Sequence, residues 1–410
     1  MRPGLPASLV NELDNLPAPY SQYRGLAERA LERLFYDAAM PIDGERIFIS
    51  TGDIPAMWLR DSSFQVKPLI RFSGDQEIYR FVSKVIAAQS FFIAIDPYAN
   101  AFNAQPNSNC WKRDFEDQSP WVFERKWEVD SLISHLQVSL DLYQVSGQSR
   151  HLNQTWWRSV VIILDTLERE TNHDSNSYRF LRSDAPVYDF LSHDGYGAPF
   201  RSAGLIWSGF RPSDDACTLP FNIPQNAYAS AQLRRLAGVA NGEIAARALS
   251  LAATVSEAIT NFGLIDGIYA YEVDCLGNHL MMDDANIPSL LSLPYLDYCS
   301  KDDETYLKTR SFVLSEVNPW FFTGSKLAHI GSQHTGPMRA WPLALAMEII
   351  TSKTKEPDLM ANLVRTASPN GALHESISVN DLADFTREWF SWAEMTFVDA
   401  LFASTSSKRI

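Results

Sequence analysis

Apolar residues recur at helical spacing along most of this chain of 410 residues. In the segment 24–38 they fall on one stripe, the pattern of a helix that packs one face against a core. That stripe consists of Leu26, Ala27, Ala30, Leu31, Leu34 and Phe35. Similar periodicity predicts further helices over 63–72, 75–95, 128–146, 153–170, 226–236, 242–262, 287–293, 302–314, 338–352, 356–366 and 384–404.

Several of these segments carry signals for their ends. Asp75 and Asn153 stand where an N-cap side chain would accept hydrogen bonds from the first helical turn. Gly147 follows segment 128–146 at the position where a left-handed residue commonly ends a helix. Segment 263–278 is the most strand-like part of the chain, and its weak alternation predicts a hairpin.

The predicted helices are joined alternately by short and long connections, with very little strand between them. No low-complexity linker and no repeat of fixed period interrupts the chain. The simplest architecture is therefore an all-α fold, with residues 1–410 forming a single domain of paired helices. Six such pairs closed into a double ring would gather the long loops at one rim.

The charge balance limits the partners that the chain can bind. Lys and Arg number 35 against 49 Asp and Glu, which gives a net charge of −14. Nucleic acids and anionic membrane surfaces both select clustered Lys and Arg, so this composition argues against them. A neutral ligand such as a sugar is compatible with it. No obligate protein partner is indicated.

The sequence also suggests a compartment. The first residues lack a basic end followed by a long apolar core, and no apolar run approaches the roughly 20 residues that span a bilayer. The cysteines are widely spaced without a CxxC pattern, which favours reduced thiols. We therefore expect a cytoplasmic protein that does not enter a membrane.

Several predicted loops share aromatic, carboxylate and amide side chains. Solvated surface loops would carry more Lys, Glu and Ser and fewer Trp, Phe and Pro. Exposed aromatic faces stack on sugar rings, and carboxylates and guanidinium groups bind hydroxyls, so a carbohydrate site is the leading interpretation. A local Arg–Asp pair beside a core Trp would also explain the first stretch. The stretches are 50–62, 96–103, 207–228, 281–290, 331–341 and 368–381.

Two of these stretches carry carboxylates suited to glycoside hydrolysis, which needs one carboxyl group as acid and a second as base or nucleophile. In the adjacent pair Asp214-Asp215, repulsion can hold one group protonated, as an acid catalyst requires. Glu375 follows a Pro369–Gly371 turn that could mount it toward a cavity. Taken singly, each also fits a structural role as a helix cap or a local ion pair.

Other chemistries have little support. The sequence lacks a GxSxG elbow, a GxGxxG motif after a strand, a P-loop and an HExxH motif. Its histidines are scattered without metal-ligand spacing, so no metal and no cofactor are expected. His334, in the stretch GSQHT, suits a contact to a hydroxyl. The alternative is a histidine whose hydrogen bonds are made by the local backbone.

Seven motifs in order together resemble glycoside hydrolase family 125, over about residues 20–402. The resemblance implies an (α/α)6 barrel and an inverting exo-α-1,6-mannosidase that acts on mannose-containing oligosaccharides without cofactor or metal. The motifs are TGDIPAMWLRDS (51–62), DPYANAFN (96–103), WEVDSL (127–132), SGFRPSDDAC (208–217), DDANIPSLLSLPYL (283–296), SPNGALHES (368–376) and EWFSWAEMTFVDAL (388–401).

The resemblance also implies roles for residues. It assigns the general acid to the Asp214-Asp215 pair and the general base to Glu375. Asp214 is favoured as the acid because related α-barrel glycosidases place it at the first Asp after Ser-Gly, although residues 211–213 intervene here. The neighbouring Asp would then orient the acid or bind sugar.

Further residues are predicted to contact the sugar. Glu394 departs from the family pattern, in which we expect Asn, and this removes an expected amide contact. The predicted hydroxyl contacts are Arg60, Asp61, Arg211 and His334, the predicted stacking residues are Trp58, Tyr98 and Trp207, and Asn100 and His374 complete the set.

Two alternatives remain open at this point. The first is another α-barrel glycosidase that acts on glucose, such as a trehalase or an α-glucosidase. The second is a non-catalytic glycan-binding protein, although such a protein would not need both the Asp214-Asp215 pair and Glu375. Inversion predicts about 6.5–9.5 Å between the two carboxyl groups, and exo action predicts a closed pocket.

Overall fold

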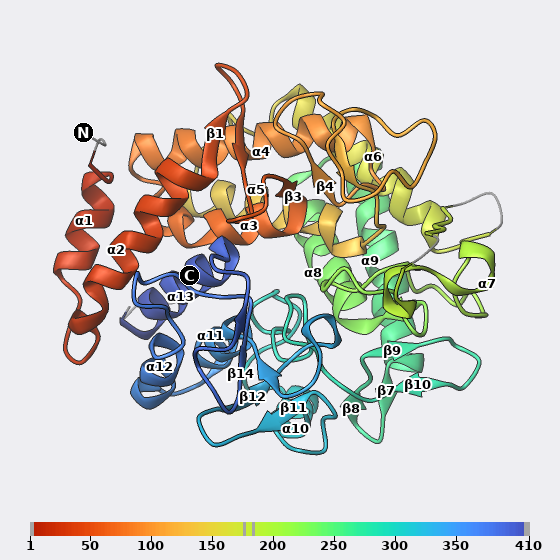
Figure 1. Cartoon of the computed structure of the whole chain (residues 1–410). Helices are drawn as coiled ribbons and strands as arrows, with labels where there is room; N and C mark the ends of the chain where they lie inside the picture. Colours follow the sequence, from red (N-terminus) through yellow and green to blue (C-terminus); the bar gives the residue numbers. More distant parts are fainter. Residues whose placement is uncertain (1–3, 175–177, 183–184, 406–410) are drawn as a thin grey trace.

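Helices are the main regular structure of the computed structural model, which describes residues 4–174, 178–182 and 185–405 (Figure 1). The helices are α1 (Ala7–Asp14), α2 (Arg24–Arg33), α3 (Leu59–Val66), α4 (Gln76–Ile95), α5 (Val129–Ser146), α6 (Gln154–Glu170), α7 (Ser192–Gly195), α8 (Ile223–Val239), α9 (Gly242–Phe262), α10 (Glu304–Val313), α11 (Pro342–Thr351), α12 (Pro357–Val364) and α13 (Ser391–Thr405).

Short antiparallel strands connect the helices and form only two- and three-stranded sheets within the described residues. The sheets are β1 (Ala39–Pro41) with β2 (Ile47–Ile49); β3 (Met57–Trp58), β4 (Ala101–Phe102) and β5 (Val122–Glu124); β10 (His279–Leu280), β9 (Glu272–Val273) and β6 (Phe221–Asn222); β7 (Leu264–Ile265) with β8 (Ile268–Tyr269); β11 (Phe321–Thr323) with β12 (Ala328–Ile330); and β13 (Arg339–Ala340), β14 (Ser376–Ser378) and β15 (Phe385–Thr386).

Five helices form an inner layer. Helix α3 packs against α5, α5 against α8, α11 against α13, and α13 against α3. Every residue of α3 is buried, and α5, α8, α11 and α13 are buried around most of their circumference. A helix enclosed in this way needs apolar or hydrogen-bonded residues on all its faces.

The other long helices lie outside this layer and each buries a single face. Helix α2 packs against α13, α9 against α8, and α12 against α11. Helices α4 and α6 both pack against α5 and also contact each other. The predicted caps of this group are confirmed: Asp75 accepts a hydrogen bond from Glu77 N, and Asn153 accepts from Thr155 N and Trp156 N. Gly147, after α5, has φ +67° as expected.

Most of the predicted helices are confirmed, but the one expected over 287–293 is wrong. That segment is an irregular run of turns between Pro288 and Pro294. The carboxylate of Asp283 accepts hydrogen bonds from the backbone N–H groups of Leu290 and Leu291 at 2.8 and 2.9 Å. These bonds satisfy backbone donors that a helix would have paired internally, so the turns persist without one.

Several boundaries also differ from the prediction: α3 covers Leu59–Val66 where a helix over 63–72 was expected, and α11 begins at Pro342 instead of residue 338. Helix α13 begins at Ser391 instead of near residue 384, because Phe385 and Thr386 form β15 and pair with β14. The chain also forms α1, which the sequence analysis did not predict. The strand-like segment 263–278 does form hairpin strands, β7 with β8 and then β9.

Helix α4 corrects one further expectation. By length and composition it could cross a membrane, although no run of that kind was expected. More than half of its most apolar window is buried within the protein, where it packs against α5 and α6. Core helices of water-exposed proteins pass the same test, so its composition is explained by the packing.

Phe64 connects several inner segments. Its ring stacks on Trp392 of α13, with centroids 5.8 Å apart, and contacts the rings of Tyr228 and Tyr295. The side chain is almost fully buried. Such a ring contributes both burial and shape to the core, and its removal leaves a cavity.

We therefore expect Phe64→Ala to lower the free energy of unfolding by about 3–5 kcal/mol. Leu249→Ala is the control, because Leu249 is exposed on α9 and such surface changes stay within about 0.5 kcal/mol. Urea titrations followed by circular dichroism measure both. Equal losses in the two variants would contradict the central packing role of Phe64.

Candidate active site

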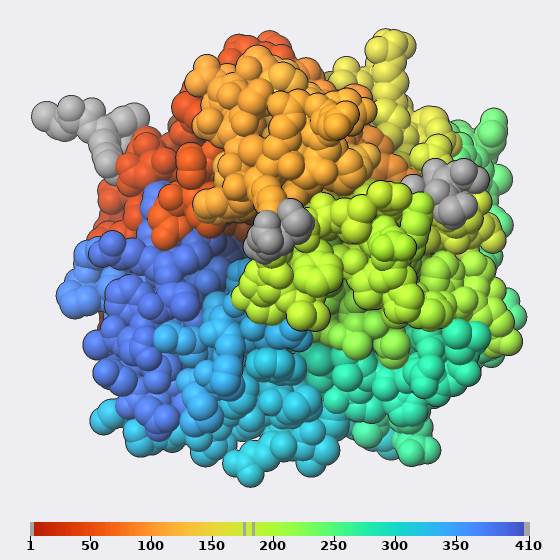
Figure 2. Space-filling model, turned by 45° about the vertical axis from the view of Figure 1, so that its right-hand side comes forward, coloured from red at the N-terminus to blue at the C-terminus, as the bar shows by residue number. Residues whose placement is uncertain are grey.

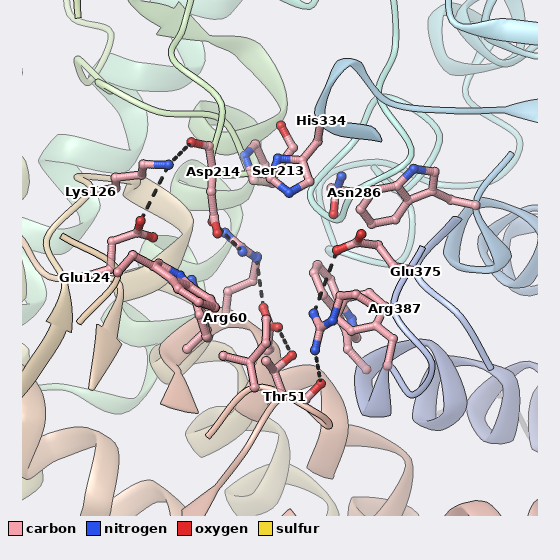
Figure 3. Close-up of a pocket in the computed structure, with 18 of the residues that line it drawn as sticks. Thr51, Arg60, Glu124, Lys126, Ser213, Asp214, Asn286, His334, Glu375 and Arg387 are labelled. Atoms are coloured by element: carbon pink, nitrogen blue, oxygen red, sulfur yellow. Dashed lines mark hydrogen bonds and ion pairs between the residues drawn. The ribbon is translucent and has the colours of Figure 1, made fainter. Parts of the chain in front are cut away.

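A cavity of about 350 Å³ lies where the inner helices begin (Figure 3). Its walls come from loops that lead into α3, α5, α8, α11 and α13, so segments far apart in sequence meet there. The lining residues are Thr51, Ile54, Trp58, Arg60, Asp61, Trp111, Glu124, Lys126, Arg182, Asp189, Pro212, Ser213, Asp214, Asn286, His334, Trp341, Glu375, Arg387, Phe390 and Trp392.

Arg60, in the first turn of α3, is the central cation of this cavity. Its Nη1 donates to Glu128 Oε2 at 2.7 Å, and its Nη2 donates to Asp214 Oδ1 at 3.1 Å. Asp130 Oδ2 lies 3.4 Å from Nη1, and Asp61 Oδ1 lies 3.4 Å from Nε. Burial alone would lower the pKa of Arg60, but these carboxylates raise it well above its ordinary value. The guanidinium therefore stays charged.

Asp61 and Trp58 form the wall beside Arg60. Asp61 Oδ2 accepts a hydrogen bond from Thr51 Oγ1 at 2.5 Å. Burial raises the pKa of Asp61, and Arg60 and Thr51 act in the opposite direction. The Trp58 ring packs edge-on against Phe123, and its Nε1 is buried without a hydrogen-bond partner in the part of the chain described. A buried donor left in this way is available to a ligand.

Asp214 turns into the cavity from the loop before α8. Its φ of +66° lies in the left-handed region, which Asp tolerates better than most residues. Lys126 Nζ donates to the backbone carbonyl of Asp214 at 2.8 Å, and the backbone of Asp215 accepts a bond from Arg211 N at 2.7 Å. This turn directs the two adjacent carboxylates to different neighbours.

Asp215 does not line the cavity but contacts a residue that does. Its Oδ1 accepts a hydrogen bond from His334 Nδ1 at 3.0 Å, and its side chain is 1% exposed. Burial would lower the pKa of His334, but the hydrogen bond and charge of Asp215, with the charges of Glu375 and Asp214, raise it to about 9. His334 is therefore an imidazolium at neutral pH.

Asp214 and Glu128 form a coupled pair. Burial by itself acts to raise the pKa of both carboxyl groups. The pKa of Asp214 nevertheless lies below its ordinary value. Burial is outweighed there by Arg60, by a hydrogen bond with Glu128, and by the charges of Lys126 and His334. The pKa of Glu128 is raised well above its ordinary value. Burial raises it most, and the charges of Asp214 and Asp130 act in the same direction. The same contacts therefore move the two pKa values in opposite directions.

Glu375 faces Asp214 from the other side of the cavity (Figure 3). Arg387 Nη1 lies 3.8 Å from Glu375 Oε1. The same guanidinium donates to Asp53 Oδ1 at 2.6 Å and to the carbonyl of Thr51 at 3.1 Å. Arg387 thus connects the loop of Glu375 to the loop that leads into α3.

Charged and aromatic residues extend the cavity beyond Asp214. Lys126 Nζ lies 2.7 Å from Asp189 Oδ1 and 3.6 Å from Glu124 Oε1. Arg182 Nη1 donates to Asp189 Oδ2 at 2.8 Å. Trp111 is 58% exposed at this edge. Figure 2 shows the orange and yellow-green loops that supply these residues side by side on one face.

Residues 23–402 match the family of metal-independent α-mannosidases, glycoside hydrolase family 125. The chain belongs to this family. A structure of a metal-independent α-mannosidase from Streptococcus pneumoniae, in a non-productive complex with α-1,6-mannobiose, is 34% identical, with a TM-score of 0.94 over 98% of this chain and 99% of that chain.

Two further proteins are similar to this chain, one in sequence and one in fold alone. The meiotically up-regulated gene 157 protein of Schizosaccharomyces pombe is 35% identical over 86% of this chain and 75% of its own length. A wild-type glycosidase structure is 14% identical with a TM-score of 0.57, covering 98% of this chain and 99% of that chain, and therefore shares only the fold. Among the described residues of this family 125 member, no group of three or more His, Cys, Asp or Glu could hold a metal ion.

Of the predicted contact residues, Trp58, Arg60, Asp61, Asp214, His334 and Glu375 meet in the cavity. Tyr98 and Trp207 do not. Tyr98 Oη donates to Glu170 Oε1 at 2.5 Å, and Trp207 is fully buried with its ring stacked on His173 at 3.7 Å. Both rings are enclosed by protein, so the prediction that they stack directly on a sugar has no support in this geometry.

Three other predicted contacts lie behind the cavity wall. Arg211 is paired with Glu272, and its Nε lies 2.5 Å from Glu272 Oε1. Asn100 donates toward Glu124 and Glu128, and His374 stacks on Phe385 at 3.6 Å. All three side chains are buried and none lines the cavity, so we assign them to its support.

Glu394, which replaces the expected Asn, also lies outside the lining. Its carboxylate accepts hydrogen bonds from Arg33 Nη2 at 2.6 Å and from Trp389 Nε1 at 2.9 Å. Arg33 Nη2 also donates to the carbonyl of Gly371 at 2.7 Å, in the loop that leads to Glu375. The buried carboxylate at this position pairs with the partly buried guanidinium of Arg33, which an Asn could not neutralise.

Sequence reasoning missed several lining residues. Asn286 and Trp341 lie within stretches already singled out for their aromatic and amide content, so that signal could have found them. Lys126, Arg182 and Arg387 had no such signal. Each is a single basic residue whose position depends on ion pairs with distant segments.

The raised pKa of His334 gives a pH prediction. The ion pair with Asp215 contributes stability that is fully present below a pH of about 6.5, the ordinary value, and is lost as the pH rises through about 9. NMR titration of the imidazole, assigned with a His334→Gln variant, should show a midpoint near the higher value. Asp215→Asn should return the midpoint toward the ordinary value. A midpoint that stays unshifted in the unaltered protein would contradict the pairing.

Proposed function

We propose that this protein is an exo-acting α-1,6-mannosidase that removes non-reducing terminal mannose with inversion at C1. The observation that carries the proposal is the placement of Asp214 and Glu375 on facing walls of one cavity, in a member of an α-mannosidase family. The similarity to a protein whose structure was determined with α-1,6-mannobiose supports the linkage.

In this proposal Asp214 is the general acid and Glu375 the general base. Asp214 lines the cavity, whereas Asp215 is enclosed and bonded to His334. Asp215 then holds His334 charged and oriented toward the sugar. This division supports Asp214 within the acidic pair, because only a group that reaches the ligand can protonate it.

The reaction transfers two protons. Asp214 protonates the glycosidic oxygen as the bond from C1 to that oxygen breaks. Glu375 removes a proton from a water molecule that attacks the opposite face of C1. The products are β-mannose and the shortened acceptor. The guanidinium of Arg387 lies beside the carboxyl group of Glu375, at 3.8 Å.

The terminal mannose would be held by the wall around Arg60. Arg60, Asp61 and His334 offer charged hydrogen-bonding groups to its hydroxyls, and Trp58 offers an apolar face with an unpaired Nε1 donor. The cavity volume of about 350 Å³ lies at the small end of the range for ligand sites. A small site of this kind supports exo action on a chain end.

We further propose that the helices form an (α/α)6 barrel within one catalytic domain. The packing order of α3, α5, α8, α11 and α13 supports this arrangement. The turn segment 289–298 would take the sixth inner position. Gln232 of α8 donates to Leu296 O at 2.9 Å, and Tyr295 Oη donates to Asp399 of α13 at 2.8 Å.

The direct test is proton NMR of a fresh digest of α-1,6-mannobiose. We expect β-mannose as the first-formed anomer, which then mutarotates, and no hydrolysis of maltose or trehalose. First-formed α-mannose would contradict inversion. Turnover of maltose or trehalose in preference to mannobiose would favour a glucose-specific enzyme, and binding of mannose without any turnover would favour a glycan-binding protein.

Substitution of the two carboxylates tests their roles. Glu375→Gln and Asp214→Asn should each lower kcat for α-1,6-mannobiose by about 10²–10⁴-fold, because each removes one proton transfer, while mannose still binds. Glu388→Gln is the matched control, since Glu388 is an exposed carboxylate in the same region and lies outside the cavity. Near-normal turnover by Glu375→Gln would exclude Glu375 as the base.

A further inference from the structure

One guanidinium in this cavity faces an excess of carboxylates. Asp61, Glu128, Asp130 and Asp214 all lie within 3.4 Å of Arg60 nitrogens. Each of these side chains is largely buried, and Glu128 and Asp130 are fully buried. One cation cannot neutralise four buried anions, and an uncompensated buried charge costs several kcal/mol. The cluster must therefore retain at least one proton.

The other nearby cations do not remove this excess. Lys126 is engaged by Glu124 and Asp189, and it reaches Asp214 through the backbone carbonyl. His334 is paired with Asp215. The proton of the cluster therefore has to be held by one of its own carboxyl groups.

Glu128 is the member suited to hold it. Its side chain is 0% exposed and shares a hydrogen bond with Asp214. A protonated carboxyl can donate that hydrogen bond, whereas two carboxylates would repel each other. Burial and the charge of Asp214 both favour the neutral form of Glu128, in agreement with its raised pKa.

We propose that Glu128 stores the proton that Asp214 delivers to the glycosidic oxygen. The proposal rests on the assignment of Asp214 as the general acid. It explains how Asp214 can act as an acid although Arg60 favours its ionised form. Glu128 acts through Asp214 and does not line the cavity itself.

The transfer is balanced in atoms and charge. The O–H bond of Glu128 breaks and an O–H bond forms on Asp214. Asp214 in turn donates a proton to the glycosidic oxygen. As C1 leaves that oxygen, the proton passes from Asp214 to it, and Asp214 is again a carboxylate. Water supplies hydroxide to C1 and a proton to Glu375. After product release that proton returns to solvent, and Glu128 is reprotonated from solvent through Asp214.

The contacts of Glu128 also fit its ionised state after transfer. Oε2 accepts hydrogen bonds from Arg60 Nη1 at 2.7 Å and from Ser131 Oγ at 3.0 Å. Oε1 accepts one from Asn100 Nδ2 at 3.3 Å. Donors of this kind stabilise a buried carboxylate. Glu128 can therefore release its proton without leaving an unpaired charge.

The test compares two substrates that differ in their need for an acid. Hydrolysis of α-1,6-mannobiose requires protonation of the leaving oxygen, whereas α-mannosyl fluoride releases fluoride, which departs without it. We expect Glu128→Gln to lower kcat for mannobiose by about 10²–10⁴-fold and to leave the hydrolysis of the fluoride close to the unaltered rate. Gln keeps the size of the side chain and a donor to Asp214 but has no proton to transfer.

The matched control is Asp130→Asn, which makes the same chemical change beside the same nitrogen of Arg60. A change that acts through Arg60 alone should lower the hydrolysis rates of both substrates by the same factor. If Glu128→Gln does the same, or if it retains full activity on mannobiose, the proposal is overturned. Should Glu128→Gln not fold, as judged by circular dichroism, Glu128→Asp replaces it.

Glu128→Asp keeps a transferable proton at a longer distance from Asp214. We expect it to lose part of the mannobiose rate while it retains the fluoride rate, and equal losses on both substrates would count against proton storage. Turnover of α-1,6-mannobiose by the unaltered protein is measured alongside. Failure there would refute the proposed function itself, and it is therefore distinguishable from failure of the inference about Glu128.

Discussion

The charge of Arg60 is the constraint on which the site depends. Its guanidinium holds the side chains of Glu128 and Asp214 on adjacent nitrogens, at 2.7 and 3.1 Å, inside a wall from which water is largely removed. In such surroundings charges interact strongly, and an unpaired one is costly. The protonation states of the acidic residues around Arg60 are therefore linked.

The fold serves this site by bringing the starts of the inner helices to one place. The loops before α3, α5, α8, α11 and α13 each contribute a wall, and long-range ion pairs hold them in register. Arg387 ties the loop of Glu375 to Thr51 and Asp53. Arg33 and Glu394 anchor the same loop from behind. Support of this kind holds the carboxyl groups of Asp214 and Glu375 on facing walls of the cavity.

Regular structure was the more predictable part of the molecule. Helices such as α4, α5 and α9 carry a continuous stripe or explicit caps, and these signals are local. The segment 287–293 has an apolar pattern too, but its backbone N–H groups at Leu290 and Leu291 bond to Asp283, and the segment forms turns. That outcome depends on a contact between a side chain and the backbone, which periodicity does not report.

The sequence by itself determined the family, the mostly helical fold and the two loops that carry Asp214 and Glu375, because motif order and hydrophobic period are properties of the chain alone. Only the tertiary structure decided which residue of the Asp214-Asp215 pair lines the cavity, that Trp207 and Tyr98 are enclosed, and that Glu128 joins Asp214 at Arg60. The reason is physical: burial, charge pairing and the direction of a side chain arise from segments that meet only after folding.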